Sequence, residues 1–275
     1  MRLQEAIRDE LFRYREAGWP HLPVSKADAL LGDALQVLPT PDSELRDVLA
    51  MTACETLIEG GNCSPAALKD AFRISLQRLH DGLGESGTDS IFGRSFSALV
   101  LASLLRRDCR QLLFSKEEWK TLFSAACTQL SKERDLRGYV KGKGWAHALA
   151  HFGDLFEAAA HSPFCAAEHA DSFLSAMAPL TAEAHTFFCH FEYDRLLRAI
   201  PVFMQKGALS EKALCAWITT LPPIWPWKSG EPEEHLLLRT AMRFNRVTFL
   251  RALFALELSP AVQNAVRAAC KELPE

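Results

Sequence analysis

Three polar side chains near the middle of the chain, His147, His151 and Asp154, have types and a spacing that could support chemistry. On a helix beginning near Gly144 they stand at positions i, i+4 and i+7, within an arc of roughly 60°. A solvated helix face usually carries Lys and Glu, whereas the flanking positions here hold the small residues Ala146, Ala150, Gly153 and Ala158. We therefore expect this face to line a cleft or to pack against another helix.

The spacing of the two histidines leaves three interpretations open. His147 and His151, one turn apart, can bind one divalent metal ion, although the glutamate base of H-E-x-x-H enzymes is absent. Alternatively, His147, His151 and Asp154 are catalytic in a metal-free cleft, with a hydrogen bond from His151 to Asp154 that fixes the tautomer of a general acid/base. The third interpretation is a structural, hydrogen-bonded helix face.

A basic, glycine-containing loop precedes this helix. It carries Arg134, Arg137, Lys141 and Lys143 and is interrupted by glycines that permit close approach of the backbone. Backbone N–H groups beside such cations can hold a phosphate or a carboxylate. Neither a phosphate-binding loop nor a G-x-G-x-x-G motif is present, so a solvated basic turn is the alternative.

The elements that must position these residues read as helices. Apolar residues recur at helical spacing, Ser64-Pro65 and the Ser115–Glu118 capping box mark helix starts, and Ser210 and Ser259 start two more. We expect roughly eleven or twelve helices and no convincing strand. Because helix pairs recur at about 40 residues, the predicted fold is all-α, an irregular α-solenoid of HEAT-like or armadillo-like layers.

Composition bounds the domain organisation and the environment. The 275 residues, 48% of them hydrophobic, predict a single all-helical domain over 1–275 with a weak subdivision near 81–89, where a glycine-rich break occurs. Eight scattered cysteines and an amphipathic amino terminus without leader character predict a cytoplasmic protein. No run of apolar residues is long enough for a membrane span, so no membrane partner is expected.

The net charge of −3 argues against nucleic acid as a partner. One stripe, Arg239, Arg243 and Arg246, has the spacing to contact phosphates, and ordinary surface charge is the other interpretation.

Two segments resemble a known family. R-G-Y-V-K-G-K-G-W-A-H-A-L-A-H-F-G-D-L, residues 137–155, and F-G-R-S-F-S-A-L-V-L, residues 92–101, are similar to a bacterial family of domains of unknown function, number 2785 in that series. The resemblance implies an all-helical bacterial protein and brings no activity with it. The family pattern falls on Arg94, Ser95, Arg137, Gly138, Tyr139, Lys143, Gly144, Trp145, His147, His151 and Asp154.

These observations favour an uncharacterised helical protein with a polar, cationic cleft that binds or transforms a small anionic ligand. We expect Arg94 to lie near the His–Asp face; the predicted ligand-binding residues are Arg94, Ser95, Arg137, Tyr139, Lys143 and Trp145. The alternative is a non-enzymatic, HEAT-like scaffold that binds a protein partner and in which the motif is structural. Whether the chain is an enzyme, and which cofactor it would use, stays open at this point.

Overall fold

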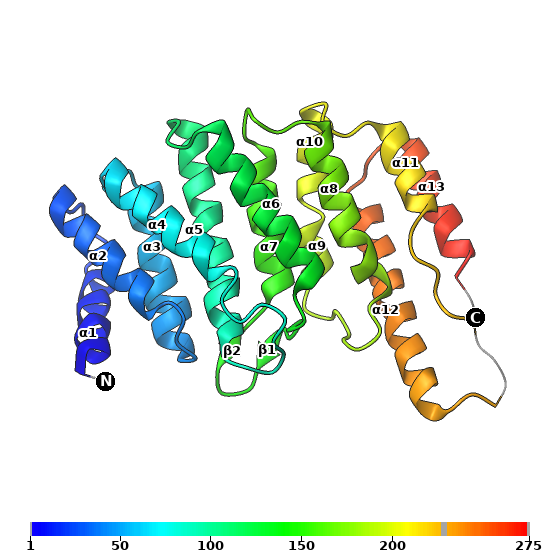
Figure 1. The fold of residues 1–275 in the computed structure, drawn as a ribbon, viewed down its shortest axis with the longest axis horizontal. Coiled ribbons are helices and arrows are strands. Elements are labelled where there is room, and N and C mark those ends of the chain that lie inside the picture. The colour runs from blue at the N-terminus through cyan, green and yellow to red at the C-terminus, as the bar shows by residue number, and fades with distance from the viewer. Residues whose placement is uncertain (1, 227–229, 274–275) are drawn as a thin grey trace.

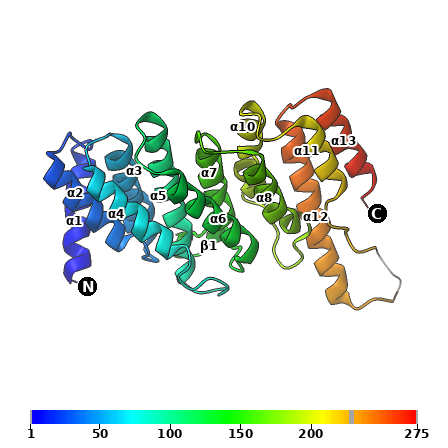
Figure 2. The ribbon, with the colours of Figure 1, turned by 45° about the horizontal axis from the view of Figure 1, so that its top comes forward.

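A computed structural model describes residues 2–226 and 230–273, and its helices are arrayed along the long axis of the molecule, with α1 near one end and α13 near the other (Figures 1 and 2). In chain order the elements are α1 (Arg2–Glu16), α2 (Val24–Val37), η1 (Glu44–Met51), α3 (Thr52–Glu59), α4 (Pro65–Arg78), α5 (Ser90–Arg110), α6 (Lys116–Lys132), β1 (Tyr139–Val140), β2 (Gly144–Trp145), α7 (Ala148–Ala160), α8 (Ala167–Met177), η2 (Ala178–Ala182), α9 (Glu192–Leu196), α10 (Ala199–Gln205), α11 (Glu211–Thr219), α12 (Glu233–Ala255) and α13 (Pro260–Lys271). The predicted all-α class is confirmed.

Four serines begin helices as the sequence predicts. The side-chain oxygens of Ser64, Ser210 and Ser259 each accept a hydrogen bond from a backbone N–H in the first turn, where no carbonyl of the helix can serve. Ser115 forms the complete capping box with Glu118 at the start of α6.

A small hairpin replaces the expected start of the central helix. β1 pairs antiparallel with β2, Tyr139 opposite Trp145, although no strand was expected from the sequence. The predicted helix start near Gly144 is also wrong, because α7 begins at Ala148 and His147 adopts a left-handed conformation, with φ 47°, as its N-cap. The hairpin pairing continues past β2, because the N–H of Ala146 donates to the carbonyl of Gly138 and the N–H of His147 donates to the carbonyl of Arg137. The helix can therefore begin only after His147.

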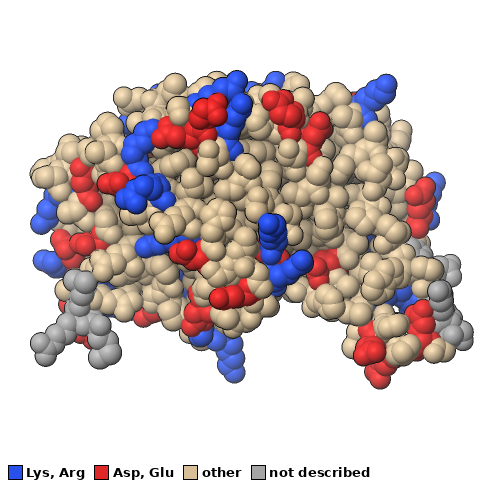
Figure 3. Space-filling view, in the orientation of Figure 1, with Lys and Arg blue, Asp and Glu red and all other residues tan. Residues whose placement is uncertain are grey.

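Surface charge is mixed. On the face shown in Figure 3, basic and acidic side chains are interspersed, and they form no broad field of one sign. Within residues 2–226 and 230–273, no helix combines the length and the apolar character that crossing a membrane requires.

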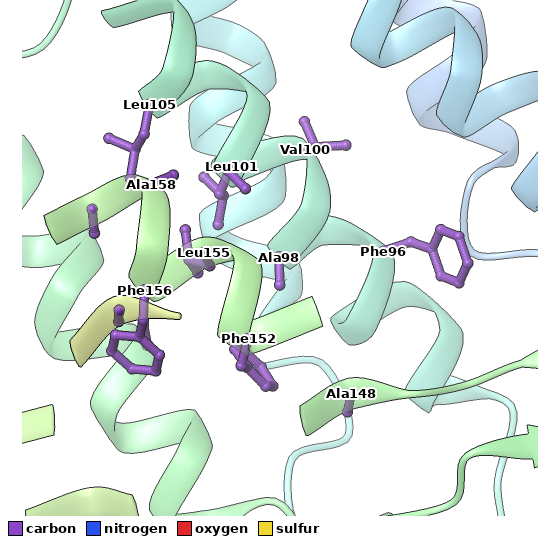
Figure 4. Packing of buried hydrophobic residues seen from close by; sticks show 14 of the residues in the cluster. Phe96, Ala98, Val100, Leu101, Leu105, Ala148, Phe152, Leu155, Phe156 and Ala158 are labelled. Carbon is purple, nitrogen blue, oxygen red and sulfur yellow. The ribbon is translucent and has the colours of Figure 1, made fainter. Parts of the chain in front are cut away.

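α5 and α7 pack against each other in the middle of the buried core. Figure 4 shows Leu101 and Leu105 of α5 close to Leu155 and Ala158 of α7, and all four side chains are buried. The apolar side chains of Leu149, Phe152 and Phe156 in α7 are also buried. One connected cluster of buried residues extends from Ile7 in α1 to Val266 in α13, so α5 and α7 hold the motif within a packed interior.

Candidate functional site

His151 lies between α7 and α5 and contacts Ser95. Its Nδ1 is 2.6 Å from the Ser95 hydroxyl oxygen, which also makes a short contact with the carbonyl oxygen of Ala146. Because a hydroxyl has one proton, the consistent arrangement is that Ser95 donates to Ala146 and accepts from the Nδ1–H of His151. Burial, assisted by the positive charge of Arg195, holds the pKa of His151 well below its usual value, so the ring is neutral.

His147 is held by the segment that precedes α9. Its Nε2 is 2.9 Å from the carbonyl oxygen of His190, to which it donates. Its ring stacks against Trp145, with centroids 4.8 Å apart, and lies 5.8 Å from the ring of His151. Burial, with a smaller contribution from Arg195, lowers the pKa of His147 to about 4.

Asp154 does not orient His151. Its carboxylate pairs instead with Arg195 of α9, with 3.0 Å between Arg195 Nε and Asp154 Oδ1 and a second, shorter contact from the guanidinium. The predicted hydrogen bond from His151 to Asp154 is therefore wrong. The reason is that Gly153 lets the backbone of α9 approach α7 closely, which brings Arg195 to the carboxylate, whereas His151 points toward α5.

Arg94 is completely buried and faces away from the predicted cleft. Its Nε and Nη2 lie 2.7 and 2.9 Å from the two carboxylate oxygens of Glu133, a bidentate ion pair. Its Nη1 donates to the carbonyls of Asp81 and Gly82, each at 2.9 Å. The expectation that Arg94 supplies a cation to the His–Asp face is not met, because its guanidinium is used to tie α5 to two loops.

Two cations of the basic loop, Arg137 and Lys143, also have partners within the chain. Arg137 forms a bidentate pair with Asp135, at 2.7 and 2.6 Å, which raises the pKa of Arg137. Lys143 Nζ is 2.6 Å from Asp89 Oδ1, although both side chains are partly exposed. The structure thus gives a carboxylate to each of the two cations that were predicted to bind an anion.

Two aromatic residues of the motif reach the surface. Tyr139 is 57% exposed and Trp145 38%, and their rings meet edge to face across the hairpin at 5.3 Å. Trp145 also contacts the ring of His190 at 5.3 Å. We call Tyr139, Trp145 and His190 the aromatic patch.

A family model described as "Protein of unknown function (DUF2785)" matches residues 79–255, which contain both motif segments. The chain belongs to this family. Comparisons with curated proteins and with solved structures found no match.

In this DUF2785 member, Arg46 of η1 is a central residue that the sequence pattern did not indicate. Its buried guanidinium lies over the rings of Phe92 and Phe96, at 4.1 and 4.8 Å, and its Nη2 donates to the carbonyl of Lys143 at 2.7 Å. Gly144 makes this approach possible, since a Cβ there would lie 3.0 Å from the guanidinium. No spacing rule links Arg46 to the hairpin, because the contact joins segments far apart in the sequence.

Glu192 of α9 is a second buried charged residue in this region. It is buried, accepts a hydrogen bond from the backbone N–H of His190, and places Oε1 3.9 Å from His147 Nε2 and 3.6 Å from His190 Nδ1. The fold places Glu192 beside two members of this region, His147 and His190 of the aromatic patch.

The His–His–Asp motif forms no metal cluster among the described residues, and it lines none of the four surface hollows described below. No group of three or more His, Cys, Asp or Glu side chains there is arranged to hold a metal ion. Four surface hollows lie between α4 and α6, on α12, between α9 and α12, and between α1 and η1, and none of these four is lined by His147, His151 or Asp154. Arg246 of the predicted basic stripe is buried and donates to carbonyls of Thr181 and Pro222.

Proposed function

We propose that this chain is a non-enzymatic helical scaffold that binds a protein partner, and that its His–His–Asp motif locks the hairpin, α5, α7 and α9 together. One observation carries the proposal: the motif side chains find their partners inside the chain, as in Asp154 with Arg195 and His151 with Ser95. A catalytic or ligand-binding group has to present an atom to its substrate.

The arrangement of the helices supports an extended binding surface. They are arrayed along one axis in both ribbon views, from α1 and α2 at one end to α11 and α13 at the other, which fits an irregular α-solenoid of HEAT-like or armadillo-like layers acting as one unit. All eight cysteines are free thiols, consistent with a reducing cytoplasm.

The aromatic patch is the surface that we assign to the partner. Exposed Tyr and Trp side chains are enriched at protein interfaces and dominate their binding energy, because they bury a large area with few rotatable bonds. Trp145 rests on His147, so the motif fixes the orientation of the patch.

The structural role of the motif is tested by His147→Ala and His151→Ala. Each change removes a hydrogen bond, to the partly buried carbonyl of His190 or to the buried hydroxyl of Ser95, so we expect the free energy of unfolding to fall by roughly 1–3 kcal/mol. Urea denaturation measures this, with the exposed His185→Ala as the matched control. Unchanged or increased stability would favour the competing function, a ligand-binding or catalytic cleft on His147, His151 and Asp154.

The binding role is tested in cells with two variants. In one, a photo-crosslinking residue replaces Tyr139; in the control, it replaces the exposed Leu112. A partner captured at Tyr139 alone is then purified. We expect Trp145→Ser to weaken its affinity at least tenfold, since hot-spot residues contribute about 2 kcal/mol or more. Equal affinity for the Trp145→Ser chain would contradict the assignment of the patch.

A further inference from the structure

α12 carries a regular row of six residues, five of them exposed and one, Val247, partly exposed. Residues with alternating spacings of four and three fall within an arc of roughly 80° at 100° per residue, which is the spacing of a coiled-coil contact. We call them the α12 seam: Glu233, Leu237, Thr240, Phe244, Val247 and Arg251.

The seam lies opposite the face by which α12 joins the molecule. Met242, Phe249 and Leu253 are buried against the rest of the chain, whereas Leu237 is 61% and Phe244 39% exposed. The amino-terminal half of α12 extends beyond the neighbouring helices in Figure 1, so a second helix has access to it.

Charge is distributed unevenly along the seam. It begins with Glu233, which Glu234 follows, and it ends with Arg251. A second α12 aligned in parallel would place like charges opposite each other at both ends. An antiparallel one would place Glu233 against Arg251 of the second copy, Leu237 against its Val247, and Thr240 against its Phe244.

We propose that the chain forms a two-fold symmetric homodimer through antiparallel pairing of α12. This pairing is self-complementary, as an isologous interface requires, because each copy supplies both the acidic and the basic end. It would also bring the exposed Leu236 of one copy to Thr248 of the other, beside a hollow of about 410 Å³ lined in part by Phe188, Phe191 and Phe244.

A second copy fits the seam better than other occupants. The carboxyl-terminal half of the seam is basic and aromatic, and its complement is an acidic and leucine-containing surface. The amino-terminal half of α12 in a second copy provides that surface at the register of antiparallel pairing. Nucleic acid would meet the carboxylates of Glu233 and Asp194 and a chain of net charge −3. The seam does not include the aromatic patch, so dimerisation stands independently of the proposed partner binding.

The test is sedimentation velocity of the full chain over a wide range of protein concentrations at low salt. We expect a monomer–dimer equilibrium that Glu233→Arg and Arg251→Glu each weaken about tenfold, since each creates two like-charge contacts per dimer. The double variant, Glu233→Arg with Arg251→Glu, should restore the parent affinity because it exchanges the two ends.

Apolar contacts are tested by Leu237→Ser and Phe244→Ser, which should also weaken the dimer, with Leu112→Ser, an exposed leucine outside the seam, as the matched control. Circular dichroism melting checks that each variant is folded. A chain that stays monomeric throughout, a dimer insensitive to the seam variants, or a double variant no tighter than the single ones would overturn the proposal. None of these results affects crosslinking at Tyr139, so the two proposals fail separately.

Discussion

One fully buried ion pair in this chain joins residues from distant segments. Arg94 and Glu133 are both fully enclosed, and removing either would leave an uncompensated charge in the interior. The type of residue at position 94 could be read from the sequence as part of a motif, but its partner could not, because no periodicity relates α5 to the end of α6. From the sequence alone, an arginine at position 94 was equally compatible with a ligand site and with an internal ion pair.

The two buried histidines predict that stability depends on pH. The folded chain holds the pKa of His147 near 4, whereas an unfolded histidine titrates near 6.5, so acid favours the unfolded state. The contribution of His147 is complete above about pH 6.5 and is lost as the pH falls toward 4, up to roughly 3 kcal/mol. His151 acts in the same direction. Urea denaturation at a series of pH values measures the slope.

His147→Gln separates the pH dependence caused by His147 from that caused by carboxylates, because the variant and the parent contain the same carboxylates. The amide can still donate to the carbonyl of His190 but does not take up a proton, so the variant should lose less stability between pH 6.5 and 4 than the parent. His185→Gln, at an exposed position, should keep the parent slope. If His147→Gln also keeps that slope, His147 is protonated at its ordinary pKa in the folded chain.

At the scale of elements, the contact between α7 and α9 depends on Gly153. A Cβ at this position would lie 2.6 Å from backbone atoms of Arg195 and Leu196, which no side-chain movement can relieve. Alanine favours a helix over glycine by about 1 kcal/mol, but here the overlap should prevail, so we expect Gly153→Ala to reduce the free energy of unfolding by roughly 1–3 kcal/mol. Thermal and urea denaturation test this.

Gly32 in α2 offers the matched control. A Cβ there would meet no atom within 4 Å, so Gly32→Ala should stabilise the chain by up to about 1 kcal/mol. If both substitutions stabilise the chain, the two helices are not held at the distance that the structure shows.

The helices themselves were largely predictable from the sequence, whereas the hairpin that connects α6 to α7 was not. The caps at Ser64 and Ser115 and the apolar side of α7 follow from local rules of hydrogen bonding and periodicity. The hairpin escaped prediction because two-residue strands are too short to show alternation. With the helix placed too early, His147 was assigned to a helix face that it does not occupy.

At the scale of the whole molecule, the family match begins at residue 79, but the hydrophobic core extends to residues before it. Phe92 and Phe96 of α5 lie under Arg46, and α3 packs directly on α5. The segment 79–255 alone would therefore expose a large apolar surface that the first 78 residues cover.

We expect the isolated segment 79–255 to aggregate or to melt well below the full chain, since helices in such rows are stabilised by their neighbours. Circular dichroism melting and size-exclusion chromatography of the two chains compare them. A monomeric segment that melts at the temperature of the full chain would show that the first helices contribute little to its stability.

The hydrogen bond from Arg46 to the carbonyl of Lys143 also bears on the order of folding. It closes a long stretch of chain that contains α3, α4, α5 and α6, and closing a long loop costs entropy that only the packed intervening helices can offset. Neighbouring helices can associate as soon as both have formed, but the contact between η1 and the hairpin can form only once that stretch has collapsed. We therefore expect the contact of Arg46 with the hairpin to form late in folding, after the helices between them.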